Sequence, residues 1–515
     1  MRSLLPLLVA AALVPLPITP PPLSTALVPL PAASPPLPAA HPPLPITPPP
    51  PSTVFSGPSS GSLPASSAVA FSGSLPASPS APAASCATSA GPNDFDGDGV
   101  DDLVVGDPFA APGGRDGAGA VHVLLGRGES GTVVRASPPE AGDGFGWSVR
   151  MTHLDADGCA DLLVGAPYAD VAGLRDAGAV YAVYGGARPR TVRLLSPNPQ
   201  AEAHFGWSLA SGGSVIAVGA PHEDADGADD SGAVYLFDSG TLGGGRRITQ
   251  DTPGVPGNSE IGDMFGWSVA IGALGGVPGE PDLAVGVPYE NDDGAGRQNG
   301  EGEIDSGSIA VLFDVSGSQG EYAARKWDLH QVVETHAGDR FGYAMAYAEE
   351  NGVGYLAVSA PLGDGGRVKD SGLVRLFRAS ATEEITPVAT FDQGAEGAAG
   401  DGYGFSLALT GEGGARLAVG VPFGGPGRRG GVRLIPVGDP ARARRIDQGG
   451  AGDHFGWSVA FSGNRLVVGA PDHGSSGAVA LLGRNDDTGI LLSPGTGRVP
   501  ALNDGGSADF GAAVG

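Results

Sequence analysis

The residues best suited to chemistry form a nine-residue acidic loop, residues 94–102, with aspartates at positions 1, 3, 5 and 9. Alternate side chains of a tightly turned loop converge on one point, and a hard divalent cation takes about six to eight oxygen ligands there. Gly99 at position 6 allows the chain to reverse its direction, and position 7 can offer its backbone carbonyl. The spacing therefore predicts a cation site. Its candidate ligands are Asp94, Asp96, Asp98, the Val100 carbonyl and Asp102.

A second loop, residues 153–161, repeats the acids at positions 3, 5 and 9 but begins with His153. Imidazole is a poor ligand for a hard cation, so we expect water or a second oxygen to replace it. Cys159 at position 7 would supply only its carbonyl. The candidate ligands of this loop are Asp155, Asp157, Cys159 and Asp161.

The other acidic stretches predict no further cation site. Residues 222–230 share the spacing of the second loop, but they follow a Gly-Ala-Pro sequence instead of preceding one, so we interpret them as a solvated loop. The segment before Asp282 offers few other oxygen ligands and indicates a decayed loop. We expect the remaining units to be metal-free, because their equivalent positions are Val215, Tyr355, Arg416 and Arg465.

An internal repeat must position these loops. Phe-Gly-Trp-Ser or a variant recurs every 52 to 76 residues, followed by an apolar run ending in Gly-Ala-Pro and then by an alternating strand. Short strands between Gly and Pro turns at this spacing are typical of a β-propeller. We expect the Gly after Phe to let backbones approach, and the aromatic residue beside it to fill the wedge between blades. The motifs begin at Phe145, Phe205, Phe265, Phe341, Tyr403 and Phe455.

The two ends of the repeat region complement each other. The first unit lacks a Phe-Gly strand, whereas residues 509–514 form such a strand with nothing after it. Joining them would complete one blade and remove the free sheet edges of the ring. The predicted fold class is all-β: a seven-bladed β-propeller over residues 92–515, with N- and C-terminal segments sharing one blade.

The Phe-Gly strand, the Gly-Ala-Pro turn and the aspartate-rich loop between them resemble the FG-GAP repeats of the integrin α-subunit propeller and its secreted bacterial relatives. The resemblance covers about residues 92–515. It implies that the acidic loops bind Ca²⁺, which braces the blade loops on one face and holds no substrate. His153 stands where the family pattern has an acid or an amide.

The region before the repeats has a different composition. It holds 23 of the 47 prolines and a single charged side chain, Arg2. Residues 1–16 predict a signal peptide, and residues 17–91 predict a disordered linker rich in Pro, Ala and Ser, so we expect no transmembrane helix in the mature chain. Two cysteines, Cys86 and Cys159, exclude a disulfide framework. So few cysteines fit either a cytosolic protein or an exported bacterial protein that core packing alone holds folded.

Two functions remain open. A formal net charge of −27 would repel nucleic acid, and the scattered histidines form no catalytic pattern. We therefore expect an extracellular or cell-surface module, exported by its signal peptide, that binds a protein or glycan for adhesion. The alternative is an extracellular hydrolase, because FG-GAP repeats also occur in proteins resembling glycosylphosphatidylinositol-specific phospholipase D. The ring leaves no room for a separate catalytic domain, so activity would have to arise from the propeller itself.

Overall fold

The computed structural model describes Cys86 and residues 91–515, apart from 128–130, 187–189, 292–302, 318–320, 330–334, 366–367, 381–382, 503–505 and 507. All described residues lie in the second of the two units into which the chain divides, Ala77–Gly515. The predicted signal peptide at 1–16 and nearly all of the predicted linker at 17–91 lie outside the described residues.

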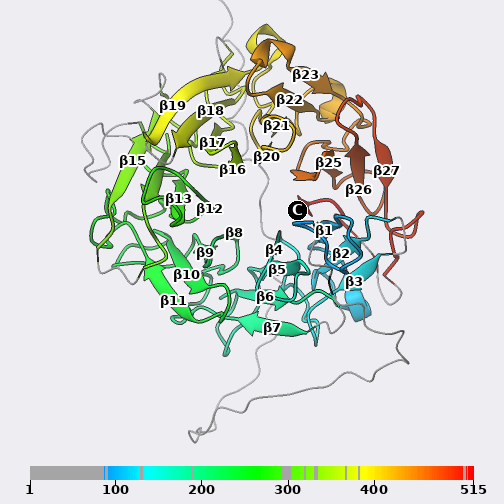
Figure 1. Ribbon diagram of the computed structural model, residues 1–515, viewed down its shortest axis with the longest axis horizontal. Helices are drawn as coiled ribbons and strands as arrows, with labels where there is room; N and C mark the ends of the chain where they lie inside the picture. The colour runs from blue at the N-terminus through cyan, green and yellow to red at the C-terminus, as the bar shows by residue number, and fades with distance from the viewer. Residues whose placement is uncertain are drawn as a thin grey trace, which may run out of the picture. The chain divides into compact units, whose positions relative to one another are not determined.

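Seven four-stranded antiparallel sheets form a ring in the second unit (Figure 1), which confirms the predicted seven-bladed propeller. The blades, in chain order, are β28(Ala513–Val514), β1(Leu103–Asp107), β2(Ala120–Leu124), β3(Thr132–Val134); β4(Ser148–Thr152), β5(Asp161–Ala166), β6(Ala179–Val183), β7(Thr191–Leu194); β8(Ser208–Gly212), β9(Val215–Ala220), β10(Ala233–Asp238), β11(Gly244–Ile248); β12(Ser268–Gly272), β13(Asp282–Val287), β14(Ser308–Leu312), β15(Ala324–Asp328); β16(Met345–Glu350), β17(Val353–Ala360), β18(Leu373–Ser380), β19(Glu383–Asp392); β20(Leu407–Thr410), β21(Arg416–Gly420), β22(Val432–Pro436), β23(Arg444–Ile446); and β24(Val459–Ser462), β25(Arg465–Ala470), β26(Ala478–Leu482), β27(Ile490–Leu492). Short 3-10 turns lie at Pro112–Gly114, Gly394–Glu396, Pro426–Arg428 and Pro440–Arg442.

The two ends of the propeller region share the first blade, as the sequence predicted. Strand β28 pairs antiparallel with β1, with Val514 opposite Val105 and Ala513 opposite Gly106. The last residue, Gly515, exchanges two backbone hydrogen bonds of 3.1 Å with Val104. This pairing gives β1 a neighbour on its inner edge and closes the ring.

The hydrophobic core lies between the blades. Seven clusters of buried side chains each join two adjacent blades, and the cluster containing Val105 and Val467 joins the last blade to the first. The aromatic residue of every Phe-Gly motif is 0% exposed, which confirms its role as the filler of the wedge. These residues are Phe145, Phe205, Phe265, Phe341, Tyr403, Phe455 and Phe510.

Two glycines of the repeat meet at six of the seven junctions between blades, and at the remaining junction Ser359 stands in place of the Gly-Ala-Pro glycine. A Cβ atom added to Gly165 of Gly-Ala-Pro would lie 2.1 Å from the carbonyl oxygen of Gly206, which belongs to the Phe-Gly motif of the next blade. Gly206 has a φ of +98°, and a Cβ atom there would lie 2.7 Å from the Ala179 carbonyl oxygen. A side chain at Gly165 or Gly206 would push these two blades apart, whereas the fifth blade accommodates the small, buried side chain of Ser359 at the position of Gly165.

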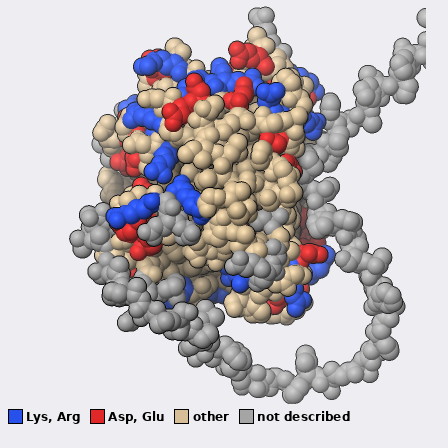
Figure 2. Space-filling model, turned by 90° about the vertical axis from the view of Figure 1, so that its right-hand side faces the viewer, with Lys and Arg blue, Asp and Glu red and all other residues tan. Residues whose placement is uncertain are grey.

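The net negative charge is not gathered into one patch on the flank of the ring shown in Figure 2. Acidic and basic side chains are interspersed along the edges of this flank, around a broad area of uncharged side chains. Within the described part of the chain, no helix has both the length and the apolar character needed to cross a membrane.

Candidate functional site

The first acidic loop leads into strand β1 and folds around a buried carboxylate. Asp94 is fully buried, and its two oxygens accept hydrogen bonds from three backbone N–H groups of the loop at 2.7–3.0 Å. Gly97 and Gly99 have φ values of +79° and +87°, which let the chain wrap around this side chain. Oxygen atoms of Asp94, Asp96 and Asp102 lie within 4.8 Å of one another. The structure therefore brings together three of the five predicted ligands.

The fourth predicted aspartate ligand, Asp98, contacts an arginine. Asp98 Oδ2 lies 3.0 Å from Nε of Arg127, and Asp98 Oδ1 accepts a hydrogen bond of 2.8 Å from the Val100 N–H. Val100 itself is half-buried. Asp98 is thus neutralised by an arginine in the structure, and the group within 4.8 Å does not include it.

The chemistry of the clustered carboxylates suits a hard cation. Burial raises the pKa of Asp102 to about 7, and burial together with the nearby charges of Asp98 and Asp94 raises the pKa of Asp96. A divalent cation among these groups would offset both the loss of hydration and the mutual repulsion. Because every donor is an oxygen, the residues fit the Ca²⁺ ion that the resemblance implies.

The second acidic loop is more open. Asp161 is fully buried, with a pKa raised by burial, whereas Asp155 and Asp157 are exposed. Asp155 and Asp157 each accept a hydrogen bond from the backbone N–H two residues later, at 3.1 and 2.9 Å. Across the described residues, these three aspartates do not form a cluster like that of the first loop. His153 is exposed.

A disulfide ties the second acidic loop to the segment that precedes the first. Cys86 and Cys159 are bonded, with their Cα atoms 5.2 Å apart across a sequence separation of 73. The expectation that core packing alone holds the fold was therefore wrong. The pairing depends on the second loop lying beside the first, where the Ala160 N–H donates to the Asp94 carbonyl at 2.8 Å. Since the Cys159 sulfur is bonded to Cys86, only the backbone of Cys159 can face a cation.

The aspartate that closes each loop has a structural role of its own. Asp102, Asp161 and Asp282 are at most 1% exposed, and each accepts backbone hydrogen bonds from the start of its loop and from the neighbouring hairpin. Asp282 therefore has a bracing role although its loop lacks the other acids. The donors are Phe95 and Gly126 for Asp102, Leu154 and Gly185 for Asp161, and Leu274 and Asp314 for Asp282, at 2.6–2.9 Å.

A ring of aromatic side chains lies at the opposite end of the inner strands. Trp147 directly precedes β4, whereas the second acidic loop follows it, so the two features lie on opposite faces of the propeller. Consecutive ring centroids are 4.8–5.6 Å apart, and the seventh position is Ala512, so the ring is open between Trp457 and Trp147. The inner ring is Trp147, Trp207, Trp267, Tyr343, Phe405 and Trp457.

A second set of aromatic residues surrounds this inner ring. These residues follow the proline of Gly-Ala-Pro and pack against the inner ring with centroid distances of 5.4–6.3 Å. Phe109, beside the gap in the ring, is 41% exposed. The outer set is Phe109, Tyr168, His222, Tyr289 and Phe423, and we call both sets together the aromatic face.

This face was not predicted from the sequence. The Phe of Phe-Gly fills the wedge, and the residue after the glycine forms the inner ring. A signal was present, since four of the five tryptophans share one position of the repeat. Seven-fold closure was needed to show that these side chains touch one another.

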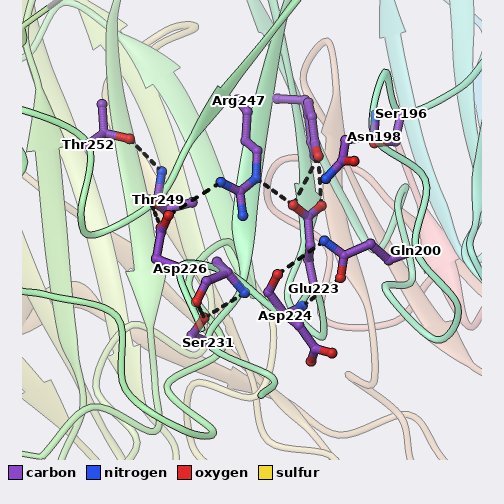
Figure 3. A network of polar contacts seen from close by, with 12 residues as sticks. Ser196, Asn198, Gln200, Glu223, Asp224, Asp226, Ser231, Arg247, Thr249 and Thr252 are labelled. Atoms are coloured by element: carbon purple, nitrogen blue, oxygen red, sulfur yellow. Dashed lines mark hydrogen bonds and ion pairs between the residues drawn. The ribbon is translucent and has the colours of Figure 1, made fainter. Parts of the chain in front are cut away.

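An ion pair between the buried Glu223 and the partly exposed Arg247 holds one loop of the aromatic face in place (Figure 3). Glu223 is fully buried and accepts hydrogen bonds from the Tyr235 hydroxyl at 2.8 and 3.0 Å and from Arg247 Nε at 2.6 Å. Asp226 accepts a hydrogen bond of 2.7 Å from the Thr249 hydroxyl. The interpretation of residues 222–230 as a solvated loop was thus wrong for Glu223, which anchors the loop to the outer strand β11. The adjacent residue, His222, belongs to the aromatic face.

Comparisons with known proteins agree with this architecture. Residues 87–124, 145–183, 190–237 and 447–481 match models of the FG-GAP repeat. The chain is 30% identical over 217 residues to integrin alpha-PS2 of Drosophila melanogaster, covering 39% of this chain and 15% of that protein. It is 31% identical over 206 residues to integrin alpha-5 of Xenopus laevis, covering 38% and 19%.

A third relative is an enzyme. Human phosphatidylinositol-glycan-specific phospholipase D is 30% identical over 171 residues, which cover 30% of this chain and 20% of the enzyme. The chain thus matches no more than a fifth of the length of any of these three relatives. The repeat matches and the closed ring of seven blades together identify the chain as an FG-GAP repeat β-propeller similar to that of the integrin α chains.

Proposed function

We propose that this protein is a secreted or cell-surface binding module that recognises a protein or glycan through its aromatic face. The observation that carries the proposal is the continuous contact of six inner-ring side chains on one face. Trp and Tyr offer large, rigid contact areas and dominate the binding energy of many interfaces. The Glu223–Arg247 pair supports the proposal, because it fixes a surface loop before any ligand arrives.

We further propose that Ca²⁺ braces the opposite face. In the first loop Asp94, Asp96 and Asp102 would hold the ion, with Asp98 and the Val100 carbonyl completing its shell. The second loop would use Asp155, Asp157, the Cys159 carbonyl and Asp161. The ion supplies positive charge at a crowded set of carboxylates, and it stiffens loops that lie far from the proposed ligand.

Binding can be tested with arrays of extracellular proteins and of glycans, probed with the fluorescently labelled full chain. We expect specific signals that fall by at least about tenfold for Trp147→Ala and Phe109→Ser. A matched control is Ile490→Ser, which removes an exposed apolar side chain from the outer strand β27. Signals that persist in both aromatic variants, or that fall equally in the control, would refute the role of this face.

A hydrolase remains the second candidate because of the match to the phospholipase D. The chain offers one distinctive group for such a role: Arg150 of the inner strand β4 is exposed, whereas the equivalent residue of every other blade is Ala or Gly. Turnover of phosphoester or glycoside substrates that is lost in Arg150→Ala but kept in Trp147→Ala would favour catalysis over binding.

A further inference from the structure

Three side chains from two loops converge beside the fifth blade, away from the acidic loops. His336 and Asp339 lie in the segment that leads to Phe341, and Asp364 follows Ala360 and Pro361. One ligand atom from each of His336, Asp339 and Asp364 lies within 4.8 Å of the others. His336 Nδ1 and Asp364 Oδ2 are 3.4 Å apart.

Backbone hydrogen bonds orient both carboxylates of this cluster. Asp339 Oδ2 accepts the N–H of His336 at 2.8 Å, and Asp364 Oδ1 accepts the N–H of Asp370 at 3.0 Å. Each carboxylate thus uses one oxygen to fix its orientation and keeps the other for a ligand. This arrangement is common in metal sites, where outer hydrogen bonds hold the ligating groups in position.

The imidazole of His336 faces Asp364 as an ion pair at 3.4 Å without forming a hydrogen bond to it. Its Nδ1 atom is buried and makes no hydrogen bond within the described structure. Asp339 is only 1% exposed, so its carboxylate is held close to this nitrogen and away from water. One imidazole nitrogen and two carboxylate oxygens thus face one another, and the nitrogen forms a hydrogen bond to neither carboxylate. Each of these atoms carries a lone pair that a metal ion can accept.

The equivalent position of the last blade holds a histidine–aspartate pair joined by a direct hydrogen bond. Asp453 stands two residues before Phe455, as Asp339 stands before Phe341. There His473 Nδ1 lies 2.8 Å from Asp453 Oδ2 in a direct hydrogen bond. The His336 cluster differs because it has a third group, a longer separation and no such bond.

We propose that His336 Nδ1, Asp339 and Asp364 bind a divalent transition metal of the Zn²⁺ class. One imidazole with two carboxylates suits Zn²⁺ and Co²⁺, whereas Ca²⁺ and Mg²⁺ prefer oxygen ligands alone. The side chains of His336 and Asp364 are 44% and 26% exposed, so the ion can enter and keep an open position for an outside ligand. The site lies on the side of the propeller that carries the aromatic face, because Asp339 precedes Tyr343 by four residues.

The test uses the full chain in excess Ca²⁺, which occupies the oxygen-only loops. We expect about one equivalent of Zn²⁺ to bind by calorimetry, and Co²⁺ to give visible absorption bands of a site with nitrogen and oxygen ligands. His336→Ala and Asp364→Asn should each weaken Zn²⁺ binding by more than the roughly 10–100-fold that outer-sphere changes cost. His473→Ala is the matched control and should bind like the parent chain.

Three results would overturn the proposal: no Zn²⁺ binding in the presence of Ca²⁺, unchanged binding in both variants, or an equal loss in His473→Ala. Thermal melting of each variant without Zn²⁺ separates loss of the site from loss of the fold. Failure here would leave the proposed binding function untouched, because the two rest on different residues.

Discussion

Asp107 in the first blade holds the backbone of Asp509, although 402 residues separate them. Its Oδ1 accepts the N–H groups of Asp509 at 3.1 Å and of Ala508 at 3.2 Å. Its Oδ2 faces Nε2 of the buried His122 at 3.8 Å, and the His122 ring packs edge-on against Phe510 at 4.9 Å. The equivalent residue in the other blades is Ala or Val, so this carboxylate is particular to the blade that closes the ring.

Asp107→Ala should loosen this closure. Ala fits sterically, since it stands at the same position in several blades, but two backbone N–H groups lose their acceptor. We expect the free energy of unfolding to fall by about 1–3 kcal/mol in chemical denaturation. Asp238→Ala, at an exposed turn, is the control. Equal stability of Asp107→Ala and the parent chain would contradict a role in closure.

Removal of Ca²⁺ should destabilise the propeller. A ligand that binds only the folded state adds about 2.7 kcal/mol at a concentration one hundred times its Kd, so a chelator should lower the melting temperature and millimolar Ca²⁺ should restore it. Asp96→Asn should remove most of this response, because Asp96 lies in the converged cluster. Asp229→Asn, in the exposed part of residues 222–230, should retain it. If neither chelator nor Ca²⁺ changes the melting temperature, the calcium assignment is wrong.

Loss of the disulfide should also cost stability. In the chain-entropy account, a loop of the Cys86–Cys159 separation stabilises the folded state by about 4 kcal/mol. We expect Cys86→Ser, Cys159→Ser and the double variant to lose similar amounts, because each removes the same bond. Denaturation under reducing conditions should bring the parent chain to the level of the variants. If reduction leaves the parent chain unchanged, the bond does not contribute to stability.

Stability should depend on pH through Asp143. Burial raises its pKa to about 7, with Glu140 adding repulsion, whereas an unfolded aspartate titrates near about 4. The folded state therefore keeps a proton that the unfolded state loses, so stability is full below about pH 4 and falls as the pH rises to about 7. Asp143→Asn should reduce this fall by about 1–3 kcal/mol, measured by denaturation at pH 4 and pH 8. The exposed Asp116→Asn should leave the pH profile unchanged; an identical profile for Asp143→Asn would contradict the assignment.

The fold could be predicted from the sequence because the signal is repeated. Phe-Gly and Gly-Ala-Pro recur in order, and each glycine has a steric reason, seen where Gly165 meets Gly206. The split blade followed from two incomplete ends, and the first acidic loop followed from the local spacing of its aspartates. Each of these features depends either on residues close together in the sequence or on the number and order of the repeats.

Only the tertiary structure decided which distant side chains touch. It paired Cys86 with Cys159, turned Asp98 toward Arg127, buried Glu223 and joined the tryptophans of separate blades into one ring. Such contacts arise because ring closure brings neighbouring blades with loops of different lengths together. The local sequence pattern of one blade does not specify which side chains then meet. The sequence alone therefore determined the kind of propeller, while ring closure determined which side chains share each of its faces.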